Sequence, residues 1–255
     1  MLLAIDIGNT NTTFGVFEGE ELRTTWRIMT NVSQMADEYA SLLLNLMHHR
    51  EVNTTDITEV ALCCVVPPLL TTFEEMLKQY FHVPPLVVGP GVKTGVSIRM
   101  DNPREVGTDR IVNAAAAHRL YGGPVIIADM GTATTFDTVS KEGDYLGGAI
   151  APGIATAAES LFTKASALPR VELVHPKQAI GTSTITAMQS GIIFGYAGLV
   201  ESIVTRIQQE LDEKARVVAT GGYAKLMAEE TSVINTVNPD LTLIGLRLIY
   251  LMNRA

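Results

Sequence analysis

Apolar and polar residues in the first part of the chain follow the two periods that separate strands from helices. Short apolar runs indicate strands, and a stripe that recurs every three or four positions over residues 33–49 indicates a helix with Ser33 as its N-cap. That stripe consists of Met35, Tyr39, Leu42, Leu43 and Leu46. The predicted order begins with a hairpin of two strands over residues 3–17 and a third strand at 21–29. A helix at 33–49, a strand at 60–66, a helix at 69–81 and a strand at 84–88 follow.

The second part of the chain begins another series of alternating elements. A loop-rich connection with a short strand at 96–99 leads to a helix over 105–121, which the Gly-Gly-Pro sequence at 122–124 ends. We place a domain boundary there, between residues 1–122 and 123–255. The further elements predicted are a second hairpin, strands at 145–150 and 215–219, and helices at 154–167, 184–211, 223–229 and 241–252. The last helix, at about 240–253, is expected to fold back onto the first domain.

The two hairpins repeat one motif. Residues 3–17 read LAIDIGNTNTTFGVF and residues 127–140 read IADMGTATTFDTVS, so that Asp6 corresponds to Asp129, Gly8 to Gly131 and Thr12 to Thr135. A turn of Gly, Asn and Thr presents backbone amides that can surround a phosphate. The carboxylate at the strand end suits Mg²⁺, K⁺ or a bound water.

A third glycine-rich turn, Ala-Thr-Gly-Gly at 219–222, lies between a predicted strand and a predicted helix. A ribose or a purine ring can lie against such bare backbone, close to a helix N-terminus. The P-loop and Rossmann glycine patterns are absent from the sequence. These features favour two duplicated ribonuclease H-like lobes of the actin, heat-shock chaperone and sugar kinase class: an α/β fold of mixed sheets flanked by helices, with the nucleotide between the lobes.

The segment NPREVGTDR at 102–110 contains the candidate acceptor chemistry. Asp109 and Arg110 fall in or just beyond the first turn of a helix, where amides and a guanidinium can hold an anion. A carboxylate there can accept the proton of an attacking hydroxyl. In isolation the pattern is better explained by an ordinary helix start with a solvated cation. Its position between the two hairpins favours a functional role.

Six motifs together resemble the type III pantothenate kinase family. They are DIGNTNTTFG at 6–15, NPREVGTDR at 102–110, DMGTATTFD at 129–137, GGAIAPG at 147–153, GTST at 181–184 and TGG at 220–222. The resemblance covers almost the whole chain and implies ATP-dependent phosphorylation of pantothenate to 4′-phosphopantothenate, the first step of coenzyme A synthesis. It also implies a homodimer, Mg²⁺, and a monovalent cation such as K⁺ or NH₄⁺.

The resemblance further implies roles for individual residues. Asp109 is the expected general base, Asp129 the ligand of the monovalent cation, and Asp6 a ligand of Mg²⁺. Thr184 is expected to bind pantothenate across the dimer interface. The expected ATP contacts are Asp6, Ile7, Gly8, Asn9, Thr10, Asn11, Thr12, Thr13 and Thr132, and the other expected pantothenate contacts are Gly107, Thr108, Asp109 and Arg110.

Two positions depart from the family pattern. Met100 stands where an aromatic residue, commonly tyrosine, precedes the Asn-Pro pair, so that one contact to pantothenate is either missing or supplied elsewhere. Thr108 stands where a smaller residue is common, a change we expect to be harmless. The helix at 184–211 is the candidate dimer interface, since Gly191, Gly195 and Gly198 permit close approach; alternatively, these glycines seat the helix against its own domain.

Composition excludes several classes of protein. A formal net charge of −8 over 255 residues argues against a general nucleic-acid binder, which needs a basic face. The apolar stretch 191–200 is shorter than the about 20 residues that span a bilayer, and no signal peptide is evident. The adjacent Cys63 and Cys64 suit a buried strand in a reducing compartment. We therefore expect a cytoplasmic protein with neither a membrane nor a nucleic acid as partner.

Two alternatives to pantothenate phosphorylation stay open from the sequence. One is a kinase of the same superfamily that acts on another small hydroxyl compound, against which the 102–110 segment argues. The other is a nucleotide-binding regulator or accessory factor of the same fold. The presence of Asp6, Asp109 and Asp129 counts against that alternative, because a protein that only binds needs no base.

Overall fold

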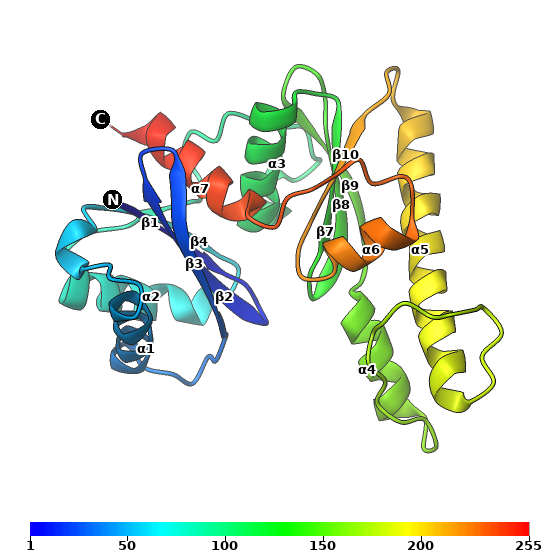
Figure 1. The fold of residues 1–255 in the computed structure, drawn as a ribbon. Coiled ribbons are helices and arrows are strands. Elements are labelled where there is room, and N and C mark those ends of the chain that lie inside the picture. Colours follow the sequence, from blue (N-terminus) through cyan, green and yellow to red (C-terminus); the bar gives the residue numbers. More distant parts are fainter. Residues whose placement is uncertain (255) are drawn as a thin grey trace. The chain divides into compact units, whose positions relative to one another are not determined.

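The computed structural model describes residues 1–254, which form two compact units. Unit 1 comprises residues 1–95, 102–116 and 242–254, and unit 2 comprises residues 96–101 and 117–241. Helix α3 (Thr108–Tyr121) contributes to both units, whereas α7 (Leu241–Asn253) belongs almost entirely to unit 1. Each unit is built around one mixed sheet (Figure 1).

The sheet of unit 1 has the strand order β3-β2-β1-β4-β5. Strands β1 and β2 and strands β2 and β3 pair antiparallel, while β4 runs parallel to β1 and β5 parallel to β4. The strands are β1 (Leu2–Ile7), β2 (Asn11–Glu18), β3 (Glu21–Met29), β4 (Glu59–Cys64) and β5 (Leu86–Val87). The helical elements are α1 (Ala36–His48), a 3₁₀ turn (Thr54–Asp56), α2 (Pro67–Met76), a π-helix (Leu77–Phe81) and a second 3₁₀ turn (Pro103–Glu105).

Helices cover both faces of this sheet because neighbouring residues of a strand point to opposite sides. The Phe14 ring of β2 stacks with the ring of Phe73 in α2, which in turn lies 4.7 Å from the ring of Tyr39 in α1. The next residue, Gly15, faces the other way, where a Cβ atom would lie 2.8 Å from the side chain of Leu243 in α7. The core of unit 1 thus lies between the sheet and α1 and α2, and α7 packs on the opposite face.

The sheet of unit 2 has the order β11-β10-β7-β8-β9-β6, and α5 packs along it together with α4 and α6 (Figure 1). Ile126, Phe136, Ile193 and Val200 are among the fully buried residues of its core. The strands are β6 (Ser97–Ile98), β7 (Val125–Met130), β8 (Ala133–Val139), β9 (Asp144–Pro152), β10 (Arg216–Thr220) and β11 (Thr236–Val237). The helices that lie wholly within unit 2 are α4 (Ile154–Lys164), α5 (Thr184–Glu210) and α6 (Ala224–Glu230).

The two sheets confirm the duplication, but they correct its register. In both units a hairpin is followed by an antiparallel third strand, and the first strand pairs parallel with a later one. Both second strands also shift register at the same place, between Val16 and Phe17 and between Thr138 and Val139. Three residues separate β1 from β2, whereas two separate β7 from β8. The counterpart of Thr12 is therefore Thr134, and the predicted match to Thr135 is wrong by one position.

The start of α1 was also mispredicted. The helix begins at Ala36 with Met35 as its N-cap, and Ser33 lies outside it. The Glu38 carboxylate accepts a hydrogen bond from the Met35 amide at 2.8 Å and so stabilises this start in place of a serine hydroxyl. Met35 and Leu42, predicted to be on the buried stripe, are 70% and 41% exposed. The buried stripe consists of Tyr39, Ala40, Leu43 and Met47.

Other boundaries moved for reasons visible in the backbone. The helix predicted over 105–121 begins only at Thr108, because residues 103–105 form a separate 3₁₀ turn. The Asn102 side chain accepts a hydrogen bond from the Arg104 amide there. The helix predicted over 69–81 consists of α2 and the π-helix, which ends where His82 adopts a φ of 57°. Strand β9 extends to Pro152, two residues beyond the strand predicted at 145–150, because Pro152 pairs with Ala133 of β8.

Helix α5 is long and apolar enough to cross a membrane by length and composition, the one such helix in the described part of the chain. Core helices of water-soluble proteins meet the same criteria. Ile193, Tyr196, Val200 and Val204 of α5 are buried against unit 2, so that packing in a protein core accounts for the apolar character of this helix.

Candidate active site

The turn of the first hairpin, at residues 8–10, offers exposed backbone for an anion. Its ends are joined by a hydrogen bond from the Gly8 amide to the Asn11 carbonyl oxygen, at 3.0 Å. Asn9, Thr10 and Asn11 are exposed, and a Cβ atom on Gly8 would lie only 3.0 Å from the Asn11 oxygen. A small residue is therefore needed at position 8, and the turn leaves exposed amides of the kind that hold phosphate.

Two of the predicted ATP contacts have their side chains inside the protein. Ile7 and Thr12 are both fully buried, and the Thr12 hydroxyl lies 2.9 Å from that of Thr30. Any contact of these two residues with a nucleotide therefore runs through the backbone. Thr13, half-buried, pairs with Asp6 across the hairpin.

Asp6 and Asp109 both lie near the Cys63 thiol, at the same edge of the sheet in unit 1. Asp6 of β1 is in register with Cys63 of the parallel strand β4. The Cys63 thiol donates a hydrogen bond to the Thr108 hydroxyl at 3.3 Å, and that hydroxyl donates in turn to the Cys64 carbonyl oxygen at 3.3 Å. These two hydrogen bonds fix the start of α3, and with it Asp109, at the end of β4.

The electrostatics of Cys63 show the proximity of both carboxylates. Burial raises the pKa of this fully buried thiol well above its ordinary value, and the negative charge of Asp6 adds to the increase. The hydrogen bond with Thr108 lowers the pKa in part, and the charge of Asp109 raises it again. Cys63 therefore stays a neutral thiol near two acids, which suits a packing group rather than a nucleophile.

The start of α3 is arranged around Gly107. Its carbonyl oxygen accepts hydrogen bonds from the amides of Arg110 and Ile111, at 3.1 and 3.2 Å. The Asp109 Oδ1 atom accepts a hydrogen bond from the Arg110 amide at 2.8 Å, and a Cβ atom on Gly107 would lie 2.5 Å from that oxygen. A carboxylate is favoured at this end of the helix dipole. The prediction that Asp109 and Arg110 lie in the first helical turn is confirmed.

In unit 2, Asp129 lies at the end of β7, beside Thr220 of the parallel strand β10. Gly221 follows with a φ of +90°, and a Cβ atom there would lie 2.7 Å from the Asp129 Oδ1 atom and from the Met130 backbone. Glycine at this position thus allows the third predicted turn to approach the Asp129 carboxylate. The Thr-Gly-Gly turn and the second hairpin are brought together at one edge of the sheet.

The start of α4 forms hydrogen bonds with the loop of the second hairpin. The Thr132 carbonyl oxygen accepts hydrogen bonds from the Gly153 amide at 3.1 Å and from the Thr156 hydroxyl at 2.8 Å. A Cβ atom on Gly153 would collide with the carbonyl oxygens of Gly131 and Thr132. Gly153, the last glycine of the GGAIAPG motif, therefore lets two carbonyl groups of the hairpin lie against the start of α4.

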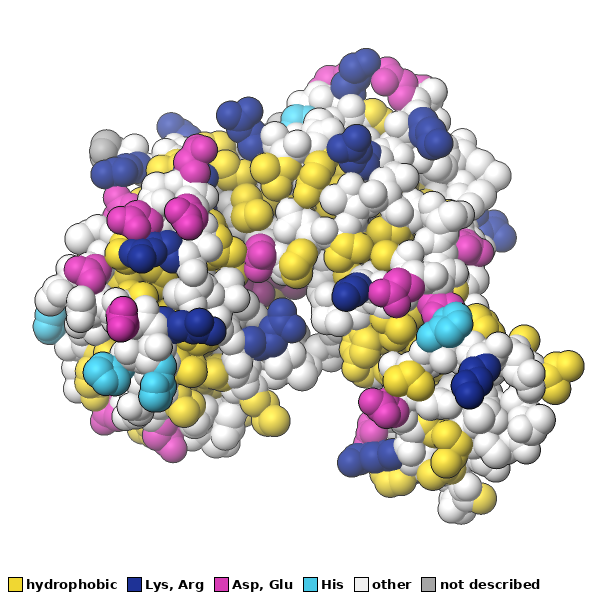
Figure 2. Space-filling model, viewed as in Figure 1, with side chains coloured by type: hydrophobic (Ala, Val, Ile, Leu, Met, Phe, Trp, Pro, Cys, Tyr) yellow, Lys and Arg dark blue, Asp and Glu magenta, His cyan; other side chains and the backbone are white. Residues whose placement is uncertain are grey.

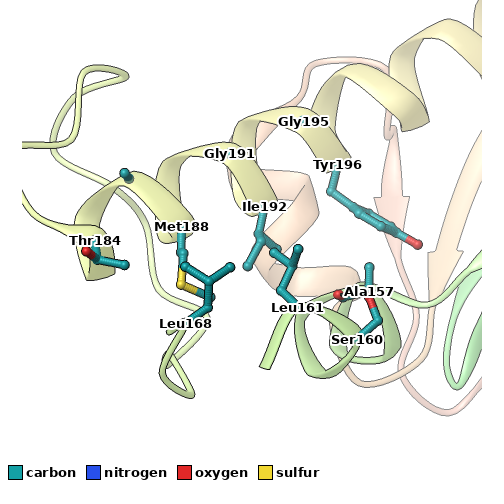
Figure 3. A pocket seen from close by; sticks show the side chains of 11 residues that line it. Ala157, Ser160, Leu161, Leu168, Thr184, Met188, Gly191, Ile192, Gly195 and Tyr196 are labelled. Carbon is teal, nitrogen blue, oxygen red and sulfur yellow. Dashed lines mark hydrogen bonds between the residues drawn. The ribbon is translucent and has the colours of Figure 1, made fainter. Parts of the chain in front are cut away.

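Thr184 is the first residue of α5 and is exposed at the end of an apolar groove of about 730 Å³. Figure 3 shows Leu161 of α4, Leu168, Met188 and Ile192 pointing toward one another in this groove, with Thr184 at its outer end. The Ser183 hydroxyl caps α5 by accepting a hydrogen bond from the Thr186 amide.

Met100, the position that departs from the family pattern, lies against the glycine-rich strand of unit 2. A Cβ atom on Gly147, which has a φ of +107°, would lie 2.9 Å from the Met100 sulfur. The thioether therefore packs over the GGAIAPG segment.

Sequence reasoning missed several residues that shape these sites. Cys63 was interpreted only as a strand residue, although it pairs with Asp6 in the parallel strand and is also affected by the charge of Asp109. Thr30 and Thr156 carry no motif of their own; each acts through a hydrogen bond to a hairpin loop. A single sequence gives no signal for such contacts, since they depend on which strand or helix end meets the loop.

Comparison with known proteins identifies the family. A family model described as Type III pantothenate kinase matches residues 2–206. A type III pantothenate kinase of Dehalococcoides mccartyi strain CBDB1 is 61% identical over 254 residues, covering 100% of this chain and 97% of its own.

Solved structures show the fold at lower identity. A Campylobacter jejuni protein named as a candidate Baf family transcriptional activator matches with a TM-score of 0.61 and 20% identity, over 98% of both chains. An inorganic polyphosphate/ATP-glucomannokinase of Arthrobacter sp. strain KM matches with a TM-score of 0.54 and 15% identity, over 99% of both chains. These two likenesses concern the fold alone, and they agree with the predicted α/β fold of mixed sheets flanked by helices. With its family model and its full-length relative, the chain belongs to the type III pantothenate kinase family.

Proposed function

We propose that this protein transfers the γ-phosphoryl group of ATP to the primary hydroxyl of pantothenate, giving 4′-phosphopantothenate and ADP, the first step of coenzyme A synthesis. Family membership supports the substrates. The observation that carries the chemistry is the pair of carboxylates, Asp6 and Asp109, whose charges both act on the Cys63 thiol at one sheet edge of unit 1. One acid can serve the metal–phosphate end of the reaction and the other the acceptor hydroxyl.

Asp109 is the proposed general base. As the pantothenate oxygen forms its bond to the γ-phosphorus, the bond from that phosphorus to the β,γ-bridging oxygen breaks and ADP leaves with the electron pair. The hydroxyl proton passes to the Asp109 carboxylate. Gly107 and the Arg110 amide hold this carboxylate in place, which is the positioning that proton transfer needs.

The remaining contacts divide between substrate and phosphates. Gly107, Thr108 and Arg110 are proposed to hold pantothenate, with the Arg110 guanidinium opposing its carboxylate or the charge on the phosphoryl group. The backbone of residues 8–13 and the exposed side chains of residues 9–11 are proposed to hold the ATP phosphates, with Thr132 adding a contact from the second hairpin. Stabilisation of the transferred charge by fixed dipoles supplies most of the rate in such reactions.

Mg²⁺ fits the chemistry of Asp6. The described residues contain no group of three or more His, Cys, Asp or Glu side chains that could hold a metal ion. Mg²⁺ in kinases needs no such cage, because one or two carboxylates, substrate phosphates and water complete its octahedral shell. When bound, it would neutralise charge on the phosphates, with Asp6 as its protein ligand.

A monovalent cation fits the second hairpin. Asp129 supplies a carboxylate there, and the loop of the same hairpin supplies backbone carbonyl oxygens. Carboxylate and carbonyl oxygens are ligands that K⁺ accepts in place of its water shell. We propose that Asp129 holds K⁺ or NH₄⁺, and that replacing K⁺ with Na⁺ lowers kcat in the wild type but changes little in Asp129→Asn.

A homodimer and a cytoplasmic location complete the proposal. Exposed Leu161 lines the apolar groove beside α5, and Phe162 and Ile185, the chain neighbours of the lining residues Leu161 and Thr184, are exposed as well. Figure 2 shows hydrophobic side chains exposed over the α4 part of unit 2. Exposed apolar patches of this kind mark protein interfaces. Thr184 lies on this groove, which fits its proposed contact with pantothenate across the dimer. Both cysteines are free thiols, as is usual in reducing compartments.

Asp109→Asn tests the assignment of the base. The amide has the shape of the carboxylate but cannot take the proton, so kcat should fall by about 10²–10⁴-fold while the Kd for ATP stays within about twofold. Single-turnover kinetics with pantothenate and ATP, together with calorimetric titration of ATP, measure both quantities. A variant that keeps most of its kcat would show that Asp109 is not the base.

The substrate is tested separately by an assay coupled to ADP release, run in K⁺ and in Na⁺. ADP release that depends on pantothenate supports the proposal. Release with another hydroxyl compound, and none with pantothenate, would instead support a different acceptor. No ADP release with either would favour the nucleotide-binding regulator.

A further inference from the structure

Thr30, the residue that directly follows β3, hydrogen-bonds the loop of the first hairpin at three points. Its amide donates to the Thr10 carbonyl oxygen at 2.9 Å. Its hydroxyl donates to the Gly8 carbonyl oxygen at 2.7 Å and lies 2.9 Å from the Thr12 hydroxyl. All three bonds lie within unit 1, and they reach both ends of the turn.

These bonds determine the direction in which the loop amides point. In a trans peptide the carbonyl and the following N–H point in opposite directions. The peptide bonds of this loop are trans, since the cis bond of the described chain is at Gly123–Pro124. With the Gly8 and Thr10 carbonyls turned toward Thr30, the amides of Asn9 and Asn11 point away from it. Both residues are exposed, so Thr30 turns the anion-binding side of the loop outward.

Thr30 is itself anchored to the core. The next residue, Asn31, exchanges two hydrogen bonds with the Tyr39 hydroxyl: the Asn31 amide donates at 2.9 Å, and the hydroxyl donates to the Asn31 carbonyl at 3.0 Å. Tyr39 of α1 is fully buried, with its ring 4.7 Å from that of Phe73 in α2. The loop is therefore connected through Thr30 and Asn31 to a side chain that cannot move independently of the core.

The duplicated hairpin provides a second, independent observation. In unit 2 the Thr132 carbonyl oxygen accepts a hydrogen bond from the Thr156 hydroxyl at 2.8 Å. Thr156 lies in α4, whereas Thr30 follows a strand, so the two threonines are not copies of one ancestral position. Both hairpins thus have a loop carbonyl fixed by a threonine hydroxyl from outside the hairpin.

We propose that Thr30 is a positioning residue for the phosphate-binding loop: its hydroxyl holds the Gly8 carbonyl so that the loop amides stay directed at the ATP phosphates. Thr30 need not touch the nucleotide. This inference rests on the proposed phosphate role of the first hairpin, and its effect should be confined to ligands that carry phosphates.

Thr30→Val is the decisive variant, because it keeps the branched shape and the backbone amide but removes the hydroxyl. Thr30→Ser restores the hydroxyl, and Thr25→Val makes the same change at an exposed position of β3 as a control. For Thr30→Val we expect KM for ATP and Kd for tripolyphosphate to rise about tenfold. The Kd for adenosine and the KM for pantothenate should stay unchanged. Thr30→Ser and Thr25→Val should behave as wild type.

Two outcomes would overturn the proposal. If Thr30→Val binds tripolyphosphate as wild type does, the hydroxyl does not position the loop. If it loses adenosine, pantothenate and tripolyphosphate binding alike, with a lowered melting temperature, Thr30 supports the fold in general. Should Thr30→Val fail to fold, Thr30→Ala, which introduces no unmatched methyl group, is measured against the same criteria.

A loop variant separates failure of this inference from failure of the proposed function. Asn9→Pro removes one exposed loop amide without touching Thr30. If Asn9→Pro weakens ATP binding and Thr30→Val does not, only the role of Thr30 is wrong. If neither variant changes ATP or tripolyphosphate binding, the first hairpin is not the phosphate site.

Discussion

Gly107 sets the position of the Asp109 carboxylate, because a Cβ atom at residue 107 would lie 2.5 Å from its Oδ1 atom. In Gly107→Ala the carboxylate has to move, since a side-chain end yields more easily than the backbone. A displaced catalytic group should lower kcat by about a hundredfold. The free energy of unfolding should fall by about 1 kcal/mol or less. Steady-state kinetics and urea unfolding measure the two effects.

Gly89→Ala is the matched control for that change. A Cβ atom at residue 89 of the same unit meets nothing within 4 Å, so kcat should be unchanged. Equal kcat for Gly107→Ala and wild type would mean that the Asp109 position is not critical for the reaction. A large loss of stability in Gly107→Ala would mean that the backbone, and not the carboxylate, takes up the clash.

Tyr196 of α5 gives a prediction for alkaline pH. Burial raises the pKa of its phenol, and a hydrogen bond with Thr134 lowers it in part. The folded state therefore keeps the phenolic proton to higher pH than the unfolded chain does. This contribution to stability is complete below the unfolded pKa of about 10 and is lost as pH rises through the folded pKa.

The Tyr196→Phe variant should therefore lose less stability above pH 10 than the wild type. The two slopes of unfolding free energy against pH should differ by at most about 1.4 kcal/mol per pH unit, the value for one proton. Urea unfolding at a series of pH values measures the slopes. Parallel slopes would show that the phenol ionises equally in both states.

Individual residues were predictable where a motif repeated, and unpredictable where tertiary contacts gave them their role. The Asp-x-Gly motifs correctly indicated Asp6 and Asp129 at strand ends, because a strand and turn are local features. The contact of Cys63 with Thr108 joins residues 45 positions apart. Propensity and pattern carry no information on such a pair.

At the scale of elements, periodicity identified nearly every strand and helix, and errors gathered at their ends. α1 starts later than predicted because the Glu38 carboxylate, and not Ser33, stabilises its N-terminus. α3 starts later because Pro103 opens a separate 3₁₀ turn. Such ends depend on competition between nearly equal local hydrogen bonds, which one sequence does not resolve. The one-residue difference between the hairpin loops escaped notice because both sequences read equally well as turns.

Helix α7 provides a test at this scale. Replacing a helical glycine with alanine usually adds up to about 1 kcal/mol of stability. At Gly245 the sign should reverse, because a Cβ atom would collide with the Val112 carbonyl oxygen of α3. We expect Gly245→Ala to lower the free energy of unfolding by about 1–3 kcal/mol, measured by urea denaturation. Because α3 carries Asp109, kcat should fall as well.

Leu251→Ala places alanine in the same helix at a position that is 43% exposed, and should cost less than about 1 kcal/mol. A more stable Gly245→Ala would show that α7 can move away from α3 without penalty.

At the scale of the molecule, the duplication predicted two units of one architecture, and the two sheets bear this out. The composition of each unit was harder to predict. Unit 1 is assembled from three separate segments, and unit 2 begins with residues 96–101, before α3. A single boundary drawn along the sequence cannot describe such an arrangement. The proposed acids of unit 1 come from its first two segments, Asp6 from the one and Asp109 from the other.

The proposed dimer can be tested by a substitution in the apolar groove beside α5. Leu161 lines the apolar groove beside α5 and is 38% exposed, so a carboxylate there should oppose burial by a second copy. We expect the wild type to sediment as a dimer at micromolar concentration and Leu161→Asp as a monomer. KM for pantothenate should rise about tenfold, through loss of the contact with the partner's Thr184, while ATP binding is kept.

Leu120→Asp adds the same charge at an equally exposed leucine near the end of α3, 46% exposed, and should remain dimeric with unchanged KM. Because Leu161→Asp and Leu120→Asp each add one negative charge, a general effect of charge would appear in both variants. If the wild type were monomeric and fully active, catalysis would not need the dimer, and Thr184 would have no role across an interface. A Leu161→Asp variant that stays dimeric would place the interface on another surface.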